Sequence, residues 1–313
     1  MRAVVLGDSL MYHADWPEPS LYGDQVQVRI RRAGICNTDL ELVSGYMAFR
    51  GILGHEFVGV AETGPLKGQR VVGEINVSDR TCDMCARGIP SQCPNRTTVG
   101  ISGHDGVFAD VLALTAANLY PVPASVEDDE AVFVEPLAAA LQVTEAVHIS
   151  PRDRIVLIGA GKLGLLTAQV LALTGANVTV VARRPRPLQL LHRWGIQTVG
   201  PGTLPPGRAT VVVDCTGTSE GFAQAQDLVQ PRGTIILKST YTDLPRANLT
   251  RIAVDEIRVI GSRCGPFDAA LRLLEKKAVD VRSLIEARYP LPEALTAFEH
   301  AARPGALKVL LDF

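Results

Sequence analysis

The stretch that decides the fold class is Arg154-Ile155-Val156-Leu157-Ile158-Gly159-Ala160-Gly161-Lys162-Leu163-Gly164. An apolar strand at 154–158 runs into the turn G-x-G-x-x-G, and we expect a helix with apolar spacing at 163–173. The first glycine permits the tight turn, the second lets a pyrophosphate approach the backbone, and the third lets the helix pack on the strand. Because a helix N-terminus attracts anions, a dinucleotide is expected to bind at Gly159, Gly161, Lys162, Leu163 and Gly164.

The residues from 137 to 263 continue this alternation of strand and helix. Short apolar strands without polar alternation are typical of a parallel sheet covered on both faces. We therefore predict an α/β domain of the Rossmann type, a doubly wound parallel sheet, over 137–263. Further strands are expected at 178–181, 210–213, 234–237 and 258–260, and further helices at 187–194 and 222–229.

Two turns that follow these strands concern the choice of cofactor. Arg183 and Arg184 follow the second strand, where an acid would hold the adenosine ribose of NAD. Two guanidinium groups suit the 2′-phosphate of NADP, so we predict NADP; the alternative is two solvated arginines, with NAD still bound. The turn Asp214-Cys215-Thr216-Gly217 ends a later strand, and we expect Thr216 near the cofactor.

Residues 1–136 follow a different pattern, with short strands and many turns. Polar and apolar residues alternate over 25–31, which indicates a half-buried strand. Residues 1–6, 58–61 and 70–73 suggest further strands, which Gly-Pro and Lys-Gly pairs separate. We predict an irregular, mostly antiparallel domain over 1–136, and a final strand at 308–311.

Candidate metal ligands lie in three separate stretches: Gly34-Ile35-Cys36-Asn37-Thr38-Asp39, Gly54-His55-Glu56 and Val134-Glu135-Pro136-Leu137. They offer a thiolate, an imidazole and two carboxylates, which zinc accepts with a position left for a substrate oxygen. Each residue alone is more often a core or surface residue. Together with a dinucleotide-binding fold, they predict a catalytic zinc bound by Cys36, His55 and a carboxylate from Glu135 or Glu56.

A second candidate metal site lies between residues 79 and 93. Asp79, Cys82, Cys85 and Cys93 offer four ligands on one loop, and a closed site of this kind is structural. We predict a structural zinc with Asp79 as its oxygen ligand. The alternative is a lobe that holds no metal.

The bulk composition excludes several classes of function. The chain has 313 residues, 47% of them hydrophobic, and a net charge of -2, so no nucleic acid or anionic membrane is indicated as a partner. No apolar run reaches the roughly 20 residues of a membrane span, and residues 1–6 are too short for a signal peptide. The chain is expected in the cytoplasm, with its cysteines reduced.

The motifs G-H-E-F-V-G (54–59), E-P-L-A (135–138) and G-A-G-K-L-G (159–164), with the cysteine lobe, resemble those of the zinc-dependent medium-chain dehydrogenase/reductase family. This family contains alcohol, sorbitol, threonine and glucose dehydrogenases, and the resemblance covers essentially the whole chain. It implies a GroES-like catalytic domain over 1–136, completed by 264–313, with the Rossmann domain inserted between. We also expect a homo-oligomer, either a dimer or a tetramer.

The resemblance implies roles for further residues. Thr38 matches the hydroxyl that relays the substrate's proton, Asp39 the acid that orients the zinc histidine, and Glu41 a position where some members have a relay histidine. Glu135 stands where polyol and glucose dehydrogenases carry glutamate, and Asp79 stands where the family has a first lobe cysteine. Lys308 is expected to reach the pyrophosphate; the alternative is a solvated lysine.

These motifs predict hydride transfer between an alcohol or polyol, or its ketone or aldehyde, and the nicotinamide cofactor. A neutral small-molecule substrate is expected because no carboxylate clamp is evident. One alternative is a zinc-independent enone or quinone reductase on the same fold. Another is a structural or cofactor-sensing relative without turnover.

Overall fold

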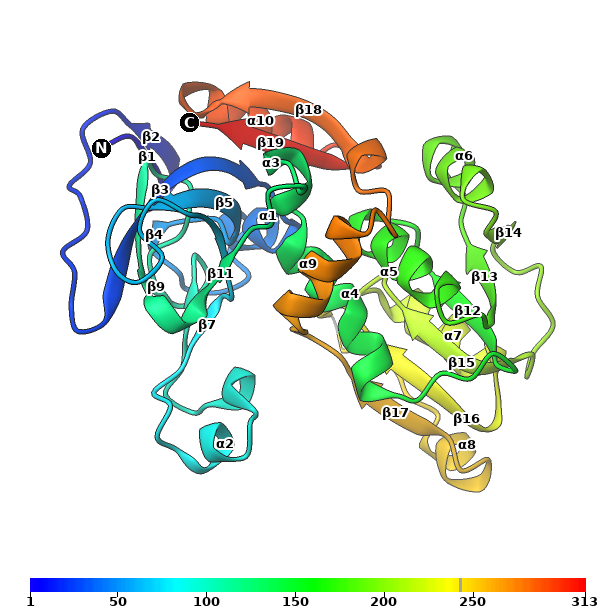
Figure 1. Cartoon of the computed structure of the whole chain (residues 1–313). Helices are drawn as coiled ribbons and strands as arrows, with labels where there is room; N and C mark the ends of the chain where they lie inside the picture. Colours follow the sequence, from blue (N-terminus) through cyan, green and yellow to red (C-terminus); the bar gives the residue numbers. More distant parts are fainter. Residues whose placement is uncertain (242–243) are drawn as a thin grey trace. The chain divides into compact units, whose positions relative to one another are not determined.

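The computed structural model describes residues 1–241 and 244–313. It divides into two compact units. Unit 1 comprises Met1–Glu135 and Phe267–Phe313, and unit 2 comprises Pro136–Pro266. Figure 1 shows that both ends of the chain, in blue to green and in orange to red, build unit 1, whereas the middle of the chain builds unit 2.

Unit 2 is built on a parallel sheet. Within the described residues this sheet has six strands in the order β14-β13-β12-β15-β16-β17. Its strands are β12 (Arg154–Ile158), β13 (Asn177–Val181), β14 (Gln197–Val199), β15 (Ala209–Asp214), β16 (Val229–Leu237) and β17 (Arg258–Gly261). Its helices are α5 (Lys162–Ala172), α6 (Pro185–Arg193), α7 (Ser219–Leu228) and α8 (Leu249–Val254), after α4 (Val134–Ala146), which starts in unit 1.

The strand order of this sheet reverses between β12 and β15. The chain moves outward from β12 to β14 and then returns to place β15 on the other side of β12. Such a reversal leaves a crevice at the carboxyl ends of the strands, where open α/β sheets bind their ligands. The predicted doubly wound parallel sheet is confirmed.

Local chemistry explains where several elements differ from their predicted ranges. Helix α6 begins two residues earlier than predicted because Pro185 occupies its first turn, where a proline needs no N–H partner. Helix α7 begins earlier because the Thr218 hydroxyl accepts the Gly221 N–H at 3.1 Å and caps the helix. Its predicted last residue, Val229, instead begins β16. The short strand β14 was not predicted.

Unit 1 contains the mostly antiparallel domain. In the part of the chain that the structure describes, its largest sheet has seven strands: β11-β6-β5-β3-β19-β18, with β10 also paired to β3. Smaller sheets have the orders β2-β1-β4 and β7-β8-β9. The pairs β18–β19 and β8–β9 are parallel, and the other pairs of unit 1 are antiparallel.

Both chain ends supply elements of unit 1. Its strands are β1 (Ala3–Leu6), β2 (Leu10–His13), β3 (Gln25–Gly34), β4 (Gly51–Ile52), β5 (Glu56–Ala61), β6 (Arg70–Gly73), β7 (Asn76–Val77), β8 (Thr97–Val99), β9 (Gly103–His104), β10 (Val111–Thr115), β11 (Leu119–Pro121), β18 (Ile285–Pro290) and β19 (Lys308–Asp312). Its helices are α1 (Asn37–Val43), α2 (Asp83–Ala86), α3 (Asp128–Ala131), α9 (Phe267–Glu275) and α10 (Ala294–Ala301), and its 3-10 turns are η1 (Pro90–Gln92), η2 (Ala116–Asn118), η3 (Arg282–Leu284) and η4 (Leu291–Glu293).

None of the helices in residues 1–241 and 244–313 is both long enough and apolar enough to cross a membrane.

Candidate functional site

Three of the predicted metal ligands meet where β3 pairs with β5. Gly34 at the end of β3 lies opposite Glu56 at the start of β5, and Cys36 follows as the N-cap of α1. His55 directly precedes Glu56, so the strand pairing brings all three side chains to one point. One ligand atom from each of Cys36, His55 and Glu56 lies within 4.8 Å of the others.

Asp39 orients this cluster from the first turn of α1. Its buried carboxylate accepts the Cys36 N–H at 2.8 Å through Oδ2, while Oδ1 lies 3.3 Å from His55 Nδ1. Burial disfavours a charged imidazole, but Asp39 and Cys36 outweigh it and raise the pKa of His55. Asp39 therefore fixes one ligand through its backbone and faces the ring of another.

A buried ion pair holds the third ligand. Lys308 on β19 contacts Glu56 Oε2 with its ammonium, and Nζ also lies 3.4 Å from the Ile35 carbonyl oxygen. Strand β3 lies between β5 and β19, and a Cβ at Gly34 would overlap the Glu56 carboxylate. The absent side chain thus leaves the space in which this pair forms. Lys308 is buried, so the alternative of a solvated lysine is wrong, whereas its predicted contact with the pyrophosphate stays a prediction.

The arrangement of donor atoms fits a metal ion. Glu56 Oε1 is buried and has no hydrogen-bond partner among the described residues. An unsatisfied buried carboxylate oxygen is costly unless a cation or a donor meets it. With a thiolate and an imidazole beside it, this oxygen completes a set of S, N and O donors that zinc accepts.

The other residues predicted for this site occupy different positions. Thr38 is half-buried, with Oγ1 3.9 Å from Cys36 Sγ. Glu41 accepts the Asn37 side-chain amide at 2.7 Å, and burial raises its pKa despite that hydrogen bond. Glu135 lies in the first turn of α4, and it is not in the described group of ligand atoms with Cys36, His55 and Glu56.

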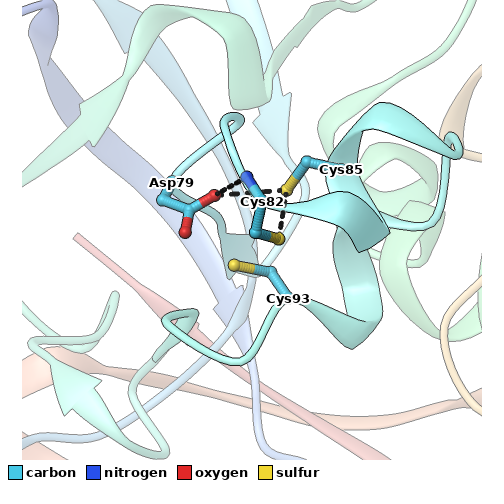
Figure 2. Close-up of side chains that lie close together, drawn as sticks. All are labelled: Asp79, Cys82, Cys85 and Cys93. Carbon is cyan, nitrogen blue, oxygen red and sulfur yellow. Dashed lines mark hydrogen bonds between the residues drawn. The ribbon is translucent and has the colours of Figure 1, made fainter.

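The second candidate metal site is the loop between β7 and β8, which contains α2 and η1. Figure 2 shows the side chains of Asp79, Cys82, Cys85 and Cys93 converging from this loop. One ligand atom from each lies within 4.8 Å of the others, and Cys82 Sγ is 3.5 Å from Cys85 Sγ. Four converging donors match a closed, structural zinc site.

The two carboxylate oxygens of Asp79 have different partners. Oδ1 accepts the N–H groups of Thr81 and Cys82 at 2.9 and 3.0 Å, and lies 3.5 Å from Cys85 Sγ. Oδ2 instead accepts the side-chain amide of Asn95 at 2.7 Å. The Thr81 N–H, the Asn95 amide and the Cys82 N–H lower the pKa of Asp79. The carboxylate therefore directs Oδ1, and not Oδ2, at the thiols.

In unit 2, the three glycines after β12 have the geometry that a dinucleotide turn needs. Gly159 has a φ of +95°, which favours glycine, and Gly161 has open space where its Cβ would lie. At Gly164 a Cβ would overlap the carbonyl oxygen of Gly159. Gly161 is also the N-cap of α5, so the Gly159 turn leads directly into the N-terminus of this helix, the end that attracts anions. An anion has room to reach the start of α5.

Three other predicted cofactor residues follow neighbouring strands of the same sheet. Arg183 and Arg184 follow β13, which pairs in parallel with β12, so they lie at the same edge as Gly159. Arg183 is exposed and Arg184 is half-buried as the N-cap of α6. Thr216 follows β15, and its methyl group would lie 3.0 Å from a Cβ at Gly159.

Sequence reasoning missed Asn95, and it missed that Lys308 pairs with Glu56. Asn95 lies two positions after Cys93, and its role depends on a hydrogen bond to a residue on the far side of the loop. The pairing of Lys308 with Glu56 joins residues 252 positions apart. No local pattern signals either contact, although Lys308 directly precedes the apolar residues of β19.

Comparison with known proteins gives matches to both units. The alcohol dehydrogenase GroES-like domain matches residues 23–124, and the zinc-binding dehydrogenase domain matches residues 163–276. A sorbitol dehydrogenase of Halalkalibacterium halodurans is 30% identical over 322 residues, which cover 94% of this chain and 93% of that protein.

Two solved structures are similar along their whole length. An alcohol dehydrogenase (rspB) from Escherichia coli CFT073, in complex with NADH, has a TM-score of 0.92 at 25% identity, covering 100% of this chain and 99% of that one. A protein of the zinc-binding dehydrogenase type from Sinorhizobium meliloti 1021, bound to NADP, has a TM-score of 0.90 at 27% identity with the same coverage. Both nicotinamide cofactors therefore occur among similar proteins.

Proposed function

We propose a function from one premise: the chain belongs to the zinc-dependent medium-chain dehydrogenase/reductase family. It is an oxidoreductase of the alcohol dehydrogenase type that uses a nicotinamide cofactor. Its fold combines a GroES-like domain with a Rossmann domain. The proposal is that it interconverts a neutral alcohol or polyol and the corresponding ketone or aldehyde, with a catalytic zinc and with NADP.

The observation that carries this proposal is the buried cluster of Cys36, His55 and Glu56. Their ligand atoms lie within 4.8 Å of one another, and Glu56 Oε1 has no hydrogen-bond partner in residues 1–241 and 244–313. A zinc-independent reductase would have no need of such a donor set. We propose Cys36 and His55 as ligands, with Glu56 or Glu135 as the third.

Bound zinc supplies a Lewis acid that lowers the pKa of an alcohol, and the nicotinamide supplies the hydride acceptor. The residues of this chain supply position and a proton path. Asp39 holds the Cys36 backbone and faces the His55 ring. The Thr38 hydroxyl, 3.9 Å from Cys36 Sγ, is proposed to accept the proton of the alcohol, with Glu41 on the same helix as a further candidate for its relay.

The choice of NADP rests on Arg183 and Arg184 at the end of β13. In this fold an acid at the end of that strand holds the ribose hydroxyls of NAD, and here two arginines stand instead. Guanidinium groups form charge-assisted hydrogen bonds with a phosphate. The polyol substrate class is supported by the similarity to a sorbitol dehydrogenase. The lobe of Asp79, Cys82, Cys85 and Cys93 is proposed to hold a second, structural zinc.

The proposal is tested by steady-state kinetics on protein of measured zinc content. A panel of alcohols and polyols is assayed with NADP and with NAD, in the wild type and in the Arg183→Ala/Arg184→Ala double variant. Each arginine contact to the 2′-phosphate contributes about 1.5–3 kcal/mol, so kcat/KM for NADP should fall at least about tenfold while that for NAD stays nearly unchanged.

Arg193→Ala, at the other end of α6, is the matched control and should change neither value. A wild type that prefers NAD, or equal losses for both cofactors, would show that the arginines point to solvent. Turnover of enones or quinones by zinc-free protein, with no alcohol oxidation, would favour the zinc-independent reductase. A zinc-loaded protein that turns over nothing in either panel would favour the non-catalytic alternative.

A further inference from the structure

A buried lysine follows the fifth strand of the parallel sheet in unit 2. Lys238 comes directly after β16, and its residue is 7% exposed. Its ammonium donates to the carbonyl oxygens of Ser262 at 3.1 Å and Arg263 at 2.7 Å, and lies 3.4 Å from Ser262 Oγ. Burying an ammonium is costly unless its N–H groups are hydrogen-bonded, and here backbone carbonyls receive them. The lysine therefore fixes the segment that follows β17.

This contact lies at the ligand-binding edge of the sheet. Backbone hydrogen bonds run along the carboxyl ends of adjacent strands, from the Cys215 N–H to the Ile158 carbonyl at 2.9 Å and from the Lys238 N–H to the Asp214 carbonyl at 2.9 Å. The next one joins the Ser262 N–H to the Leu237 carbonyl at 3.0 Å. Residues 262–263 thus belong to the same edge as the Gly159 turn.

The order of the strands assigns the two halves of a dinucleotide to the two halves of this edge. A doubly wound sheet binds one mononucleotide on each side of its reversal point. The half formed by β12, β13 and β14 carries the glycine turn and Arg183, which suit the pyrophosphate and the adenosine ribose. The half formed by β15, β16 and β17 is left for the nicotinamide, and it contains Lys238 and residues 262–263.

We propose that Lys238 is a positioning residue for the nicotinamide half of the cofactor. It acts by holding the backbone of residues 262–263, without contacting the cofactor itself. A segment that is already ordered loses less conformational entropy when a ligand binds against it. Anchoring residues 262–263 should therefore raise the affinity for the nicotinamide that binds there. The proposal rests on the proposed function, because it requires a nicotinamide cofactor.

The test compares whole cofactors with fragments that lack the nicotinamide, on the full-length zinc-loaded protein. Binding of NADPH and 2′-phospho-ADP-ribose, and of NADH and ADP-ribose, is measured by calorimetry in the wild type, Lys238→Met and Lys238→Arg. In Lys238→Met the Kd of the whole cofactor should rise at least tenfold, while the Kd of its fragment stays within twofold. Lys238→Arg keeps donors to the two carbonyls and should recover part of the affinity.

Thr234→Val on the same strand is the control, because it alters another buried polar side chain of β16 and should leave both constants unchanged. If the Kd of cofactor and fragment rises equally in Lys238→Met, Lys238 has only a structural role and the proposal is wrong. Unchanged Kd values for both would also overturn it. If Lys238→Met does not fold, the substitute measurement is the rate of backbone hydrogen exchange in residues 258–266 of Lys238→Gln. Exchange that is faster than in the wild type, and that bound cofactor slows, supports the proposal. Exchange at the wild-type rate refutes it. A wild type that binds neither pair instead rejects the proposed cofactor.

Discussion

The two candidate metal sites of unit 1 use similar donors in opposite surroundings. The cluster of Cys36, His55 and Glu56 is formed by residues at the paired ends of β3 and β5, and His55 and Glu56 are buried. The lobe of Asp79, Cys82, Cys85 and Cys93 is one loop, in which only Cys93 is buried among the four. The first site is assembled by the sheet, whereas the second is assembled by its own loop.

The difference lies also in how each site neutralises its carboxylate. Glu56 is held by the buried ammonium of Lys308, and its other oxygen has no hydrogen-bond partner among the described residues. Asp79 has no such cation in residues 1–241 and 244–313, and it is held by backbone N–H groups and by the Asn95 amide. A buried carboxylate needs a cation because water cannot solvate it, while a half-exposed one is satisfied by neutral donors.

The largest effect is expected at the buried cluster. Cys36→Ser should remove its zinc and lower turnover by about a thousandfold or more, since the Lewis acid contributes several kcal/mol to catalysis and each 1.4 kcal/mol is tenfold in rate. The measurements are zinc by plasma emission and kcat with the best alcohol. Full activity with unchanged zinc content would rule out Cys36 as a ligand.

The second-largest effect is expected on the stability of the zinc-free protein when Lys308 is replaced. Lys308→Met leaves Glu56 charged and buried without its partner, and breaking a buried pair in this way costs about 3–5 kcal/mol. Urea unfolding of zinc-free protein should show this loss, and added zinc should restore part of it by compensating the carboxylate. Lys277→Met, which removes a half-exposed lysine from its pair with Glu130, is the control and should cost much less. Equal losses of unfolding free energy in the two variants would show that the buried pair contributes no more to stability than the half-exposed one.

A smaller effect is expected at the lobe. Asn95→Ala frees Asp79 Oδ2, so the carboxylate is no longer held with Oδ1 toward the thiols. Outer hydrogen-bond partners of metal ligands typically change metal affinity about 10–100-fold. Competition with a chromophoric chelator should show zinc leaving the lobe at correspondingly lower chelator concentration. Gln92→Ala, an exposed amide in the same loop, should behave as the wild type.

The smallest effect on turnover is expected from emptying the lobe. Cys82→Ser should lower the metal content from about two zincs per chain to one and lower the melting temperature, yet leave kcat within about threefold because the closed site takes no part in the chemistry. Metal analysis and kinetics on the same sample provide the measurement. One zinc in the wild type, unchanged by the substitution, would mean that the lobe is empty.

Much of the fold was accessible from the sequence because its signals are local. The apolar strand and the three glycines occupy eleven consecutive residues, 154–164, and they form β12, its turn and the start of α5. The boundaries of α6 and α7 shifted by a few residues because a proline and a threonine begin these helices before their apolar faces. Strand β14 was missed because its three residues carry no apolar pattern.

In the candidate site, too, the sequence identified some features and left others open. The side-chain types and their motifs named Cys36, His55, Glu56 and the four lobe residues, and these two groups are the ones whose ligand atoms converge. The sequence left the choice between Glu56 and Glu135 open, and the structure groups only Glu56 with the other two in the part of the chain it describes. The assignment of the ligands themselves stays a prediction until metal is measured.

The sequence by itself determined the family, the parallel sheet and the chemical types of the donors, because each depends on residues close together in the chain. Only the tertiary structure decided that Lys308 meets Glu56 and that Lys238 meets the segment after β17. The first contact passes across β3 from β19 to β5, and the second joins the segments that follow the adjacent strands β16 and β17; no local pattern encodes either strand order. A charge is buried only where the fold brings it a partner, so the fate of each lysine was fixed by strand order rather than by its neighbours in the sequence.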